Sequence, residues 1–253
     1  MLKLFVLPIV IFISVAVSPA ASQGIDLSGL PAFSSQQTEN GDVQYSLSLQ
    51  ILALMTAVTL LPSLVLGMTS FTRIIIVLSI LRQALGTQQT PPNQVLIAIA
   101  IFLSFFIMQP TLTEIYDVSL SPFLSETLPA DQAIIEASSI MKDFMVANTR
   151  SDTLLMFSDM AGSKGYENNE DIPFSTLLPS FITSELKTAF QIGFLLFLPF
   201  LVIDMVIASI LMALGMMMLS PMLVSLPFKL LLFVLVDGWA MTVGSLAATF
   251  VTS

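Results

Sequence analysis

The sequence of 253 residues contains no cysteine and no histidine. These two absences exclude disulfide bonds, thiol nucleophiles, zinc sites of the usual kind and histidine-based acid–base catalysis. The chain also lacks the G-x-x-x-x-G-K-[ST] phosphate-binding loop of nucleotide-hydrolysing enzymes. We therefore expect neither a cofactor nor a metal ion, and we expect that the protein is not an enzyme.

Charged residues are also scarce. They make up 10% of the chain, whereas soluble domains average about 25%. The 8 lysines and arginines are scattered, which argues against nucleic-acid binding because phosphate neutralisation needs a clustered basic surface. Hydrophobic residues reach 55%, with 15 methionines and 19 phenylalanines. This is more apolar material than one soluble core of this length uses, so the surplus is expected to face lipid or partner subunits.

The N-terminal 45 residues read as two segments. Residues 1–21 begin with a lysine, continue through a short apolar run and end in small residues, which predicts a cleaved signal peptide. An uncleaved anchor helix is the alternative, but the run is shorter than the roughly 20 residues that a membrane span needs. Residues 22–45 are rich in serine, glutamine and glycine and predict a flexible periplasmic N-terminus.

The rest of the chain predicts an all-α membrane protein made of two helical hairpins. Residues 46–113 form the first hairpin and residues 188–253 the second, and the expected spans are 46–66, 95–112, 190–218 and 226–251. Residues 114–187 carry 12 acidic residues against 4 basic ones and predict an acidic helical segment. The connection within the first hairpin holds two arginines and no acid, which places it in the cytoplasm and the acidic segment in the periplasm.

Several charged residues lie inside these apolar stretches: Arg73, Arg82, Asp204, Lys229 and Asp237. A charge at the centre of a membrane helix costs roughly 2.5–3.5 kcal/mol, so such residues normally face other protein. Four spans enclose little space, and we expect the missing counterparts on other chains. The alternative for the two arginines is that they only fix the topology.

The spacing leaves the partner of Lys229 open. In an antiparallel hairpin Asp204 reaches a similar height, and Glu185 of a neighbouring subunit is the second candidate.

The turn of the second hairpin is apolar where a solvated loop would be polar. It contains Met216, Met217 and Met218. Methionine is unbranched and adapts to many shapes, which suits a deformable seal around a pore. The alternative is that these side chains fill a gap in a packed core, and the residues alone favour this second interpretation.

Two blocks of the sequence resemble the FliP/SctR family of type III secretion export-gate subunits. The first block begins SELKTAFQIGFLLFLPF and runs from Ser184 to Trp239; the second runs from Phe71 to Pro110. The resemblance covers all but the signal peptide and the segment that follows it. It implies a pentamer that assembles with FliQ and FliR into a helical, cone-shaped gate, much of it on the periplasmic side of the inner membrane.

The same resemblance implies a role for individual residues. Met216, Met217 and Met218 match a methionine-rich loop described as a gasket of the export channel. Glu185 and Lys229 match positions in contacts between adjacent subunits, and Asp204 matches an acidic position important for export. FlhB, FlhA and exported flagellar proteins are further implied partners in the flagellar basal body, and many faces of the spans would contact sister subunits instead of lipid.

Two other classes of function compete with this interpretation. An intramembrane aspartyl protease would use Asp204 and Asp237 as paired carboxylates, but the paired motifs of such proteases are not evident. An ion-coupled carrier would protonate Asp204, but carriers are usually longer and built from internal repeats, which this chain lacks.

Overall fold

The computed structural model describes residues 33–37, 43–47, 49–87, 89–163, 165–166, 168–216 and 218–250, with side chains from residue 52 onward. The predicted signal peptide and Met217 lie outside the described residues. The chain divides into two compact units, residues 1–61 and residues 62–253.

The first unit contains a short β-hairpin and the beginning of a helix. Strand β1 (Phe33–Gln37) pairs antiparallel with β2 (Val43–Leu47), and Phe33 lies opposite Leu47. Both strands belong to the stretch around residues 22–45, for which no strand was predicted. Helix α2 (Leu49–Gly67) follows and carries no charged residue across its 19 positions, as expected for the first predicted span.

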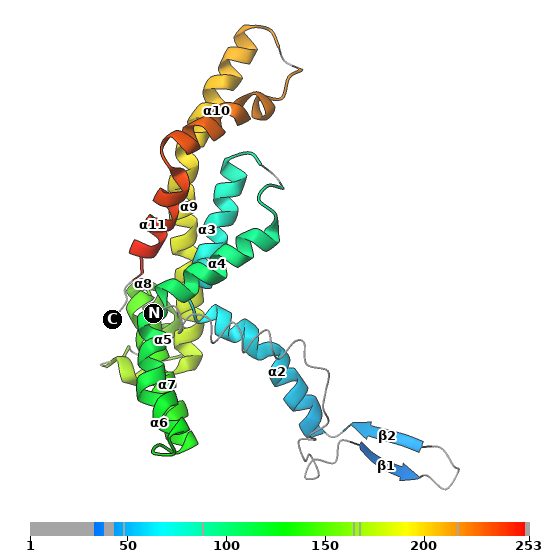
Figure 1. The fold of residues 1–253 in the computed structure, drawn as a ribbon, viewed down its shortest axis with the longest axis vertical. Coiled ribbons are helices and arrows are strands. Elements are labelled where there is room, and N and C mark those ends of the chain that lie inside the picture. The colour runs from blue at the N-terminus through cyan, green and yellow to red at the C-terminus, as the bar shows by residue number, and fades with distance from the viewer. Residues whose placement is uncertain are drawn as a thin grey trace. The chain divides into compact units, whose positions relative to one another are not determined.

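The regular secondary structure in the described part of the second unit is entirely helical, so the all-α prediction is confirmed for the body of the protein. Its elements, shown in Figure 1, are α3 (Phe71–Ala84), α4 (Asn93–Ile107), α5 (Gln109–Ile115), the π-helix η1 (Tyr116–Leu120), α6 (Ser121–Leu124), α7 (Ala130–Asn148), α8 (Ser151–Met160), the 3₁₀-helix η2 (Asn169–Asp171), α9 (Phe174–Ala213), α10 (Pro221–Leu235) and α11 (Gly238–Ala248).

The core of this unit forms where α3 packs against α9. Ile74, Val77, Leu78 and Leu81 recur at helical spacing on α3, and all four are buried. This one-sided apolar pattern is what makes an amphipathic helix stable in a folded protein. Further buried residues come from α4, α7, α9 and the end of the chain: Leu96, Ala100, Phe144, Met145, Leu177, Phe181, Ala189, Leu246 and Phe250.

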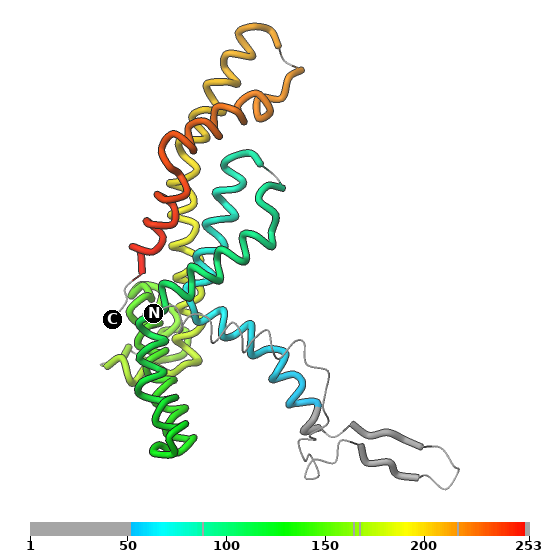
Figure 2. The backbone as a smooth tube through the Cα atoms, viewed as in Figure 1, coloured from blue at the N-terminus to red at the C-terminus, as the bar shows by residue number. Residues whose placement is uncertain are grey.

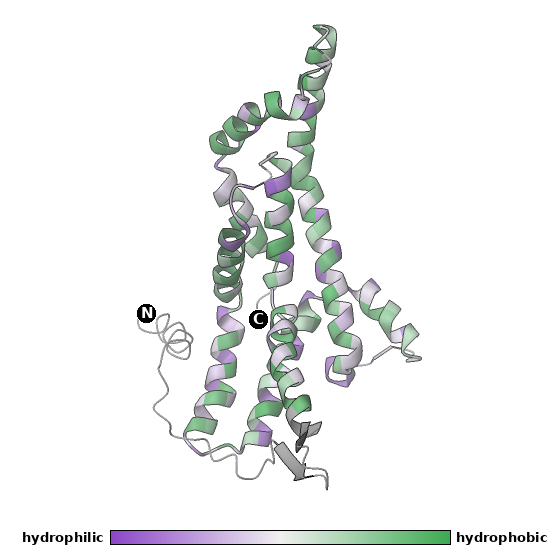
Figure 3. Ribbon diagram, turned by 90° about the vertical axis from the view of Figure 1, so that its right-hand side faces the viewer, coloured by the Kyte–Doolittle hydropathy of each residue, from purple (hydrophilic) through white to green (hydrophobic). Residues whose placement is uncertain are grey.

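Helix α9 runs unbroken for 40 residues although it contains Pro179 and Pro199 (Figure 2). Of the described helices, it is the only one that is by itself long and apolar enough to cross a membrane. The predicted third span, residues 190–218, covers its C-terminal half and runs beyond it into the following turn, because α9 ends at Ala213. Figure 3 shows hydrophobic residues along this half and along α10, and a more mixed pattern on the helices of the acidic segment.

Two of the other expected spans are bent pairs of helices. The second span breaks at Met108, where α4 meets the α5–α6 segment at 60°. The fourth breaks at Asp237, where α10 meets α11 at 63°. Together with the pair formed by α2 and α3, up to four spans are possible by length and composition. Membrane orientation and the predicted domain boundaries stay predictions.

Gly193 allows the close approach of α3 to α9. A Cβ atom added at Gly193 would overlap the side chain of Ile80, whereas one added at Gly244 on α11 would meet no atom within 4 Å. We expect Gly193→Ala to lower the free energy of unfolding by about 1 kcal/mol, because overpacking outweighs the gain in helix propensity. Gly244→Ala is the matched control and should be neutral or slightly stabilising. Denaturant unfolding of the solubilised single chain measures both, and equal effects would contradict this packing argument.

Candidate functional site: two buried charge clusters and an apolar loop

The first charge cluster lies near the N-terminus of α3 and is named here the Arg73 cluster. The Nε atom of Arg73 donates to Oε2 of Glu185 at 2.8 Å, and its Nη2 atom donates to Oε1 of the same carboxylate. The Nη1 atom donates to both the backbone oxygen and Oγ1 of Thr249, each at 3.0 Å. The guanidinium also stacks on Phe250, 3.8 Å from the ring centroid.

The ion pair of this cluster is fully enclosed, and its charged groups are hydrogen-bonded. The exposed fraction is 3% for Arg73 and 0% for Glu185. A two-pronged guanidinium–carboxylate contact fixes orientation as well as distance, which a lysine would not do. Because its members come from α3, α9 and the segment after α11, the cluster ties these three parts of the chain together.

The second charge cluster, the Lys229 cluster, lies near the other end of α3. The Nζ atom of Lys229 donates to Oδ2 of Asp204 at 2.6 Å and to the backbone oxygen of Ala84 at 3.0 Å. Oγ of Ser225 donates to the second carboxylate oxygen, Oδ1 of Asp204, at 2.6 Å. Lys229 is 2% exposed and Asp204 is 34% exposed.

The position of Ala84 explains part of this arrangement. Ala84 is the last residue of α3, and the carbonyl groups at the C-terminus of a helix attract cations. Two groups therefore stabilise the positive charge of Lys229: the carboxylate of Asp204 on α9 and the C-terminal carbonyl of α3. Ser225 precedes Lys229 by one helical turn, so both side chains face the same side of α10.

These contacts answer the question that the sequence left open. Lys229 pairs with Asp204 of its own chain, and Glu185 pairs with Arg73. The expectation that the counterparts lie on other chains is wrong for these residues. Counting spans suggested too little interior space within one chain, but the packing of α3 against α9 buries the charged side chains. A role of Glu185 or Lys229 between subunits stays a prediction.

The remaining predicted charges lie at turns. Arg82 is partly buried and donates from Nη1 to Oδ1 of Asn93 at 2.6 Å and to the backbone oxygen of Pro91 at 3.2 Å, which closes the turn between α3 and α4. Asp237 is exposed and adopts a left-handed backbone conformation, with φ of 50° and ψ of 55°, directly before α11. Neither residue joins the two clusters.

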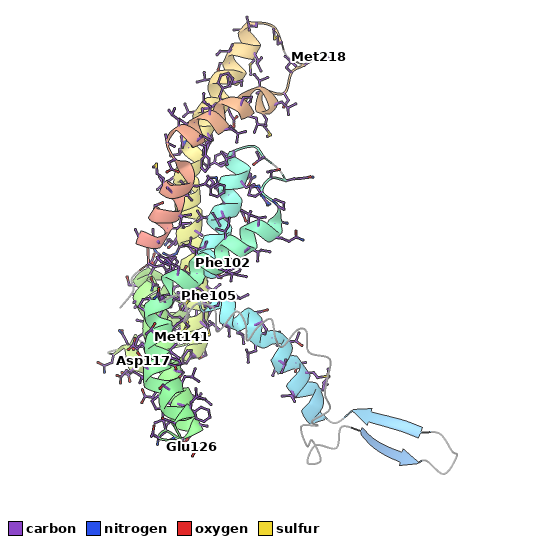
Figure 4. All side chains as sticks on the ribbon, viewed as in Figure 1. Phe102, Phe105, Asp117, Glu126, Met141 and Met218 are labelled. Atoms are coloured by element: carbon purple, nitrogen blue, oxygen red, sulfur yellow. The ribbon has the colours of Figure 1, made fainter. Side chains whose placement is uncertain are left out.

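The apolar turn between α9 and α10, residues 214–220, is named here the methionine loop. Met216 is 46% exposed and Met218 is 102% exposed. In Figure 4, Met218 lies at the tip of the loop and away from the helices. Met216 and Met218 therefore fill no gap in the described core of this chain, and the role of the loop stays a prediction.

The sequence that forms these clusters and the methionine loop matches the model of a known protein family. The FliP family matches residues 54–246, which include the whole Lys229 cluster and the Arg73–Glu185 ion pair. Thr249 and Phe250 of the Arg73 cluster lie just beyond the matched residues. This chain belongs to the FliP family. The resemblance noted for residues 71–110 and 184–239 is thereby confirmed.

Three relatives in the FliP family show how far the similarity extends. The chain is 74% identical to flagellar biosynthetic protein FliP of Cereibacter sphaeroides over 222 residues, which is 88% of this chain and 73% of the relative. It is 52% identical to FliP of Pectobacterium carotovorum subsp. carotovorum over 221 residues, 87% and 86% of the two chains. It is 50% identical to FliP of Bacillus subtilis (strain 168) over 218 residues, 86% and 97% of the two chains.

Sequence reasoning did not identify Ser225, Thr249, Phe250 and the carbonyl of Ala84 as parts of the clusters. Ser225 was open to discovery, because it precedes Lys229 by one helical turn. The other three had no local signal: Arg73 and Thr249 are 176 positions apart, and Ala84 and Lys229 are 145 apart. In the described part of the chain, no group of three or more Asp and Glu side chains is arranged to hold a metal ion.

A third, exposed ion pair links α8 to α9. Nζ of Lys187 donates to Oδ2 of Asp152 at 2.6 Å, and this hydrogen bond lowers the pKa of the Asp152 carboxyl from 3.8 to about 2. Nζ of Lys142, in contrast, donates to the backbone oxygen of Glu170. The two lysines thus offer a matched pair for a test.

We expect Lys187→Met to raise the pKa of Asp152 toward 3.8, because the donor of the hydrogen bond is lost. Since the folded-state pKa is depressed, the pair stabilises the fold above the unfolded pKa of about 4 and this contribution is lost as the pH falls through about 2. An NMR titration of the Asp152 carboxyl measures the shift. Lys142→Met should leave the titration unchanged, and an equal shift in both variants would contradict the assignment.

For the Arg73 cluster we expect strongly non-additive substitutions. Arg73→Met or Glu185→Met alone should cost about 3–5 kcal/mol of stability, because each leaves one buried charge without its partner. The double variant should recover most of this loss, since apolar side chains of similar volume replace a buried pair at little cost. Denaturant unfolding of the four proteins measures the coupling. Additive losses would show that the two side chains act independently.

Proposed function

We propose that the chain is a pore-forming subunit of the flagellar type III export gate, and that the methionine loop closes the channel through which unfolded flagellar proteins cross the inner membrane. Membership in the FliP family supports the flagellar export role. The observation that carries the sealing role is the exposure of Met216 and Met218 at an apolar turn. Large apolar side chains are not left in water at such a tip without a covering surface.

Assembly with other subunits is part of this proposal. Large apolar side chains are exposed on several helices of the second unit, among them Phe102 and Phe105 on α4 (Figure 4). The exposed residues on α9 and α10 include Phe190, Phe194, Leu195, Val202, Met205, Val206, Leu223, Leu231, Val234 and Leu235. These faces fit a homo-oligomer, for which we propose a pentamer, and contacts with FliQ, FliR, FlhB and FlhA in the basal body. Lipid covers what remains.

The geometry gives no support to the two competing functions. Both carboxylate oxygens of Asp204 are engaged, one by Lys229 and one by Ser225. Asp237 is exposed at the break between α10 and α11 and contributes to neither cluster. A protease would need two carboxylates that share one proton, and a carrier would need an acid that exchanges protons without a fixed cation beside it. We therefore propose a structural role in export and no enzymatic activity.

The sealing role is tested by removing the thioether side chains. We expect replacement of Met216, Met217 and Met218 by alanine to leave assembly intact and to make the membrane leaky to ions, because alanine fills less space than methionine and adapts less to its surroundings. Conductance of vesicles that contain the assembled complex measures the leak. Met156→Ala with Met160→Ala is the control, because these methionines are also exposed but lie on α8. An assembled complex with unchanged conductance would contradict the seal.

A further inference from the structure

The turn between α3 and α4 lies directly against the beginning of α10. A Cβ atom at Gly86 would lie 3.7 Å from Cδ1 of Leu226, 3.7 Å from Cγ of Met222 and 3.9 Å from Nζ of Lys229. The residues 222, 226 and 229 follow the i, i+4, i+7 spacing of one helix face. One face of α10 therefore rests on the turn at Gly86, where φ is 80°.

The Lys229 cluster fixes this contact. Lys229 holds the carbonyl of Ala84, two residues before Gly86, and the carboxylate of Asp204 on α9. Ser225 holds the same carboxylate at 2.6 Å and the backbone oxygen of Met222 at 3.1 Å. Met222 is four residues after Met218 of the methionine loop. Separating α10 from the turn would remove the Ala84 carbonyl from a buried cation, which opposes the separation.

The opposite end of α10 is a sharp bend between two helices. Asp237 interrupts the helix in a left-handed conformation, and α11 leaves at 63°. Gly238 has no room for a side chain, since an added Cβ would overlap the ring of Phe233. Phe233 in turn meets Trp239 edge-on, with ring centroids 5.4 Å apart. Helix α10 is thus held against the α3–α4 turn near its beginning and joined to α11 through a packed bend at its end.

We propose that the α3–α4 turn controls the position of the methionine loop, with Lys229 as the positioning residue that transmits a displacement at Gly86 through α10 to residues 214–220. The proposal goes beyond the sealing role, because it concerns where the loop lies and not what the loop closes. A change of loop position without any change in conductance would leave this proposal standing and count against the seal alone.

The absence of cysteine allows a direct test on the full chain. Nitroxide labels at Leu219→Cys in the loop and Ser139→Cys on α7 would attach only to the introduced thiols. Pulsed electron spin resonance then reports the distance between them, with labelled chains diluted among unlabelled ones. Gly86→Asn adds a side chain at the turn and tolerates the positive φ. Gly162→Asn is the matched control, because Gly162 has φ of 75° and no atom within 4 Å of an added Cβ.

We expect Gly86→Asn to move the distance distribution outside the width found for the parent chain, and Gly162→Asn to leave the distribution in place. Lys229→Met should displace the loop by itself, and adding Gly86→Asn to it should then give less than half of the shift seen in the parent background. Thermal unfolding confirms that each variant is folded. Leu226→Ala removes the same contact from the α10 side and replaces Gly86→Asn if that variant does not fold.

Two results would overturn the coupling. An unchanged distribution in Gly86→Asn, or in its replacement Leu226→Ala, would show that the turn does not act on the loop. A shift that persists in full in the Lys229→Met background would show that the displacement bypasses Lys229.

Discussion

Two cations buried among apolar helices set the arrangement of the second unit. Each needs an anion and further acceptors, since an unpaired charge in such surroundings costs several kcal/mol. Arg73 meets this need with Glu185 and Thr249, and Lys229 with Asp204 and the carbonyl of Ala84. Apolar packing alone would let α9 slide along α3, because such contacts have little direction. The two cations fix the register, one near each end of α3.

The sequence predicted the helical class, and it marked Arg73, Asp204 and Lys229 as charges that need partners, whereas Asp237, marked in the same way, is exposed. Long apolar runs are a direct signal, and a charge within them is costly enough to require a partner. The choice of partner was beyond reach, because it depends on which helices cross. The α3–α9 crossing is set by the absence of a side chain at Gly193 and by packing around Phe181, and neither leaves a periodic pattern in the sequence.

The breaks within the predicted spans show a second limit of sequence reasoning. Composition assigns residues 95–112 and 226–251 to one span each and does not predict a bend in either. The structure bends the first at Met108 and the second at Asp237. Pro110 marks the first break in the sequence, but Pro179 and Pro199 lie within α9 without interrupting it. A proline therefore predicts a helix break only where neighbouring groups do not compensate for the backbone hydrogen bond that it removes.

The bend at Asp237 also restricts where this part of the chain meets lipid. A helix that ends and restarts leaves amide and carbonyl groups without partners in the helical ladder, and hydrocarbon offers them nothing in return. The junction of α10 and α11 therefore belongs either next to other protein or next to water. The same holds for the junction of α4 and α5. The uninterrupted C-terminal half of α9, beyond the charged residues Glu185 and Lys187, is therefore the element of the second unit best suited to contact acyl chains.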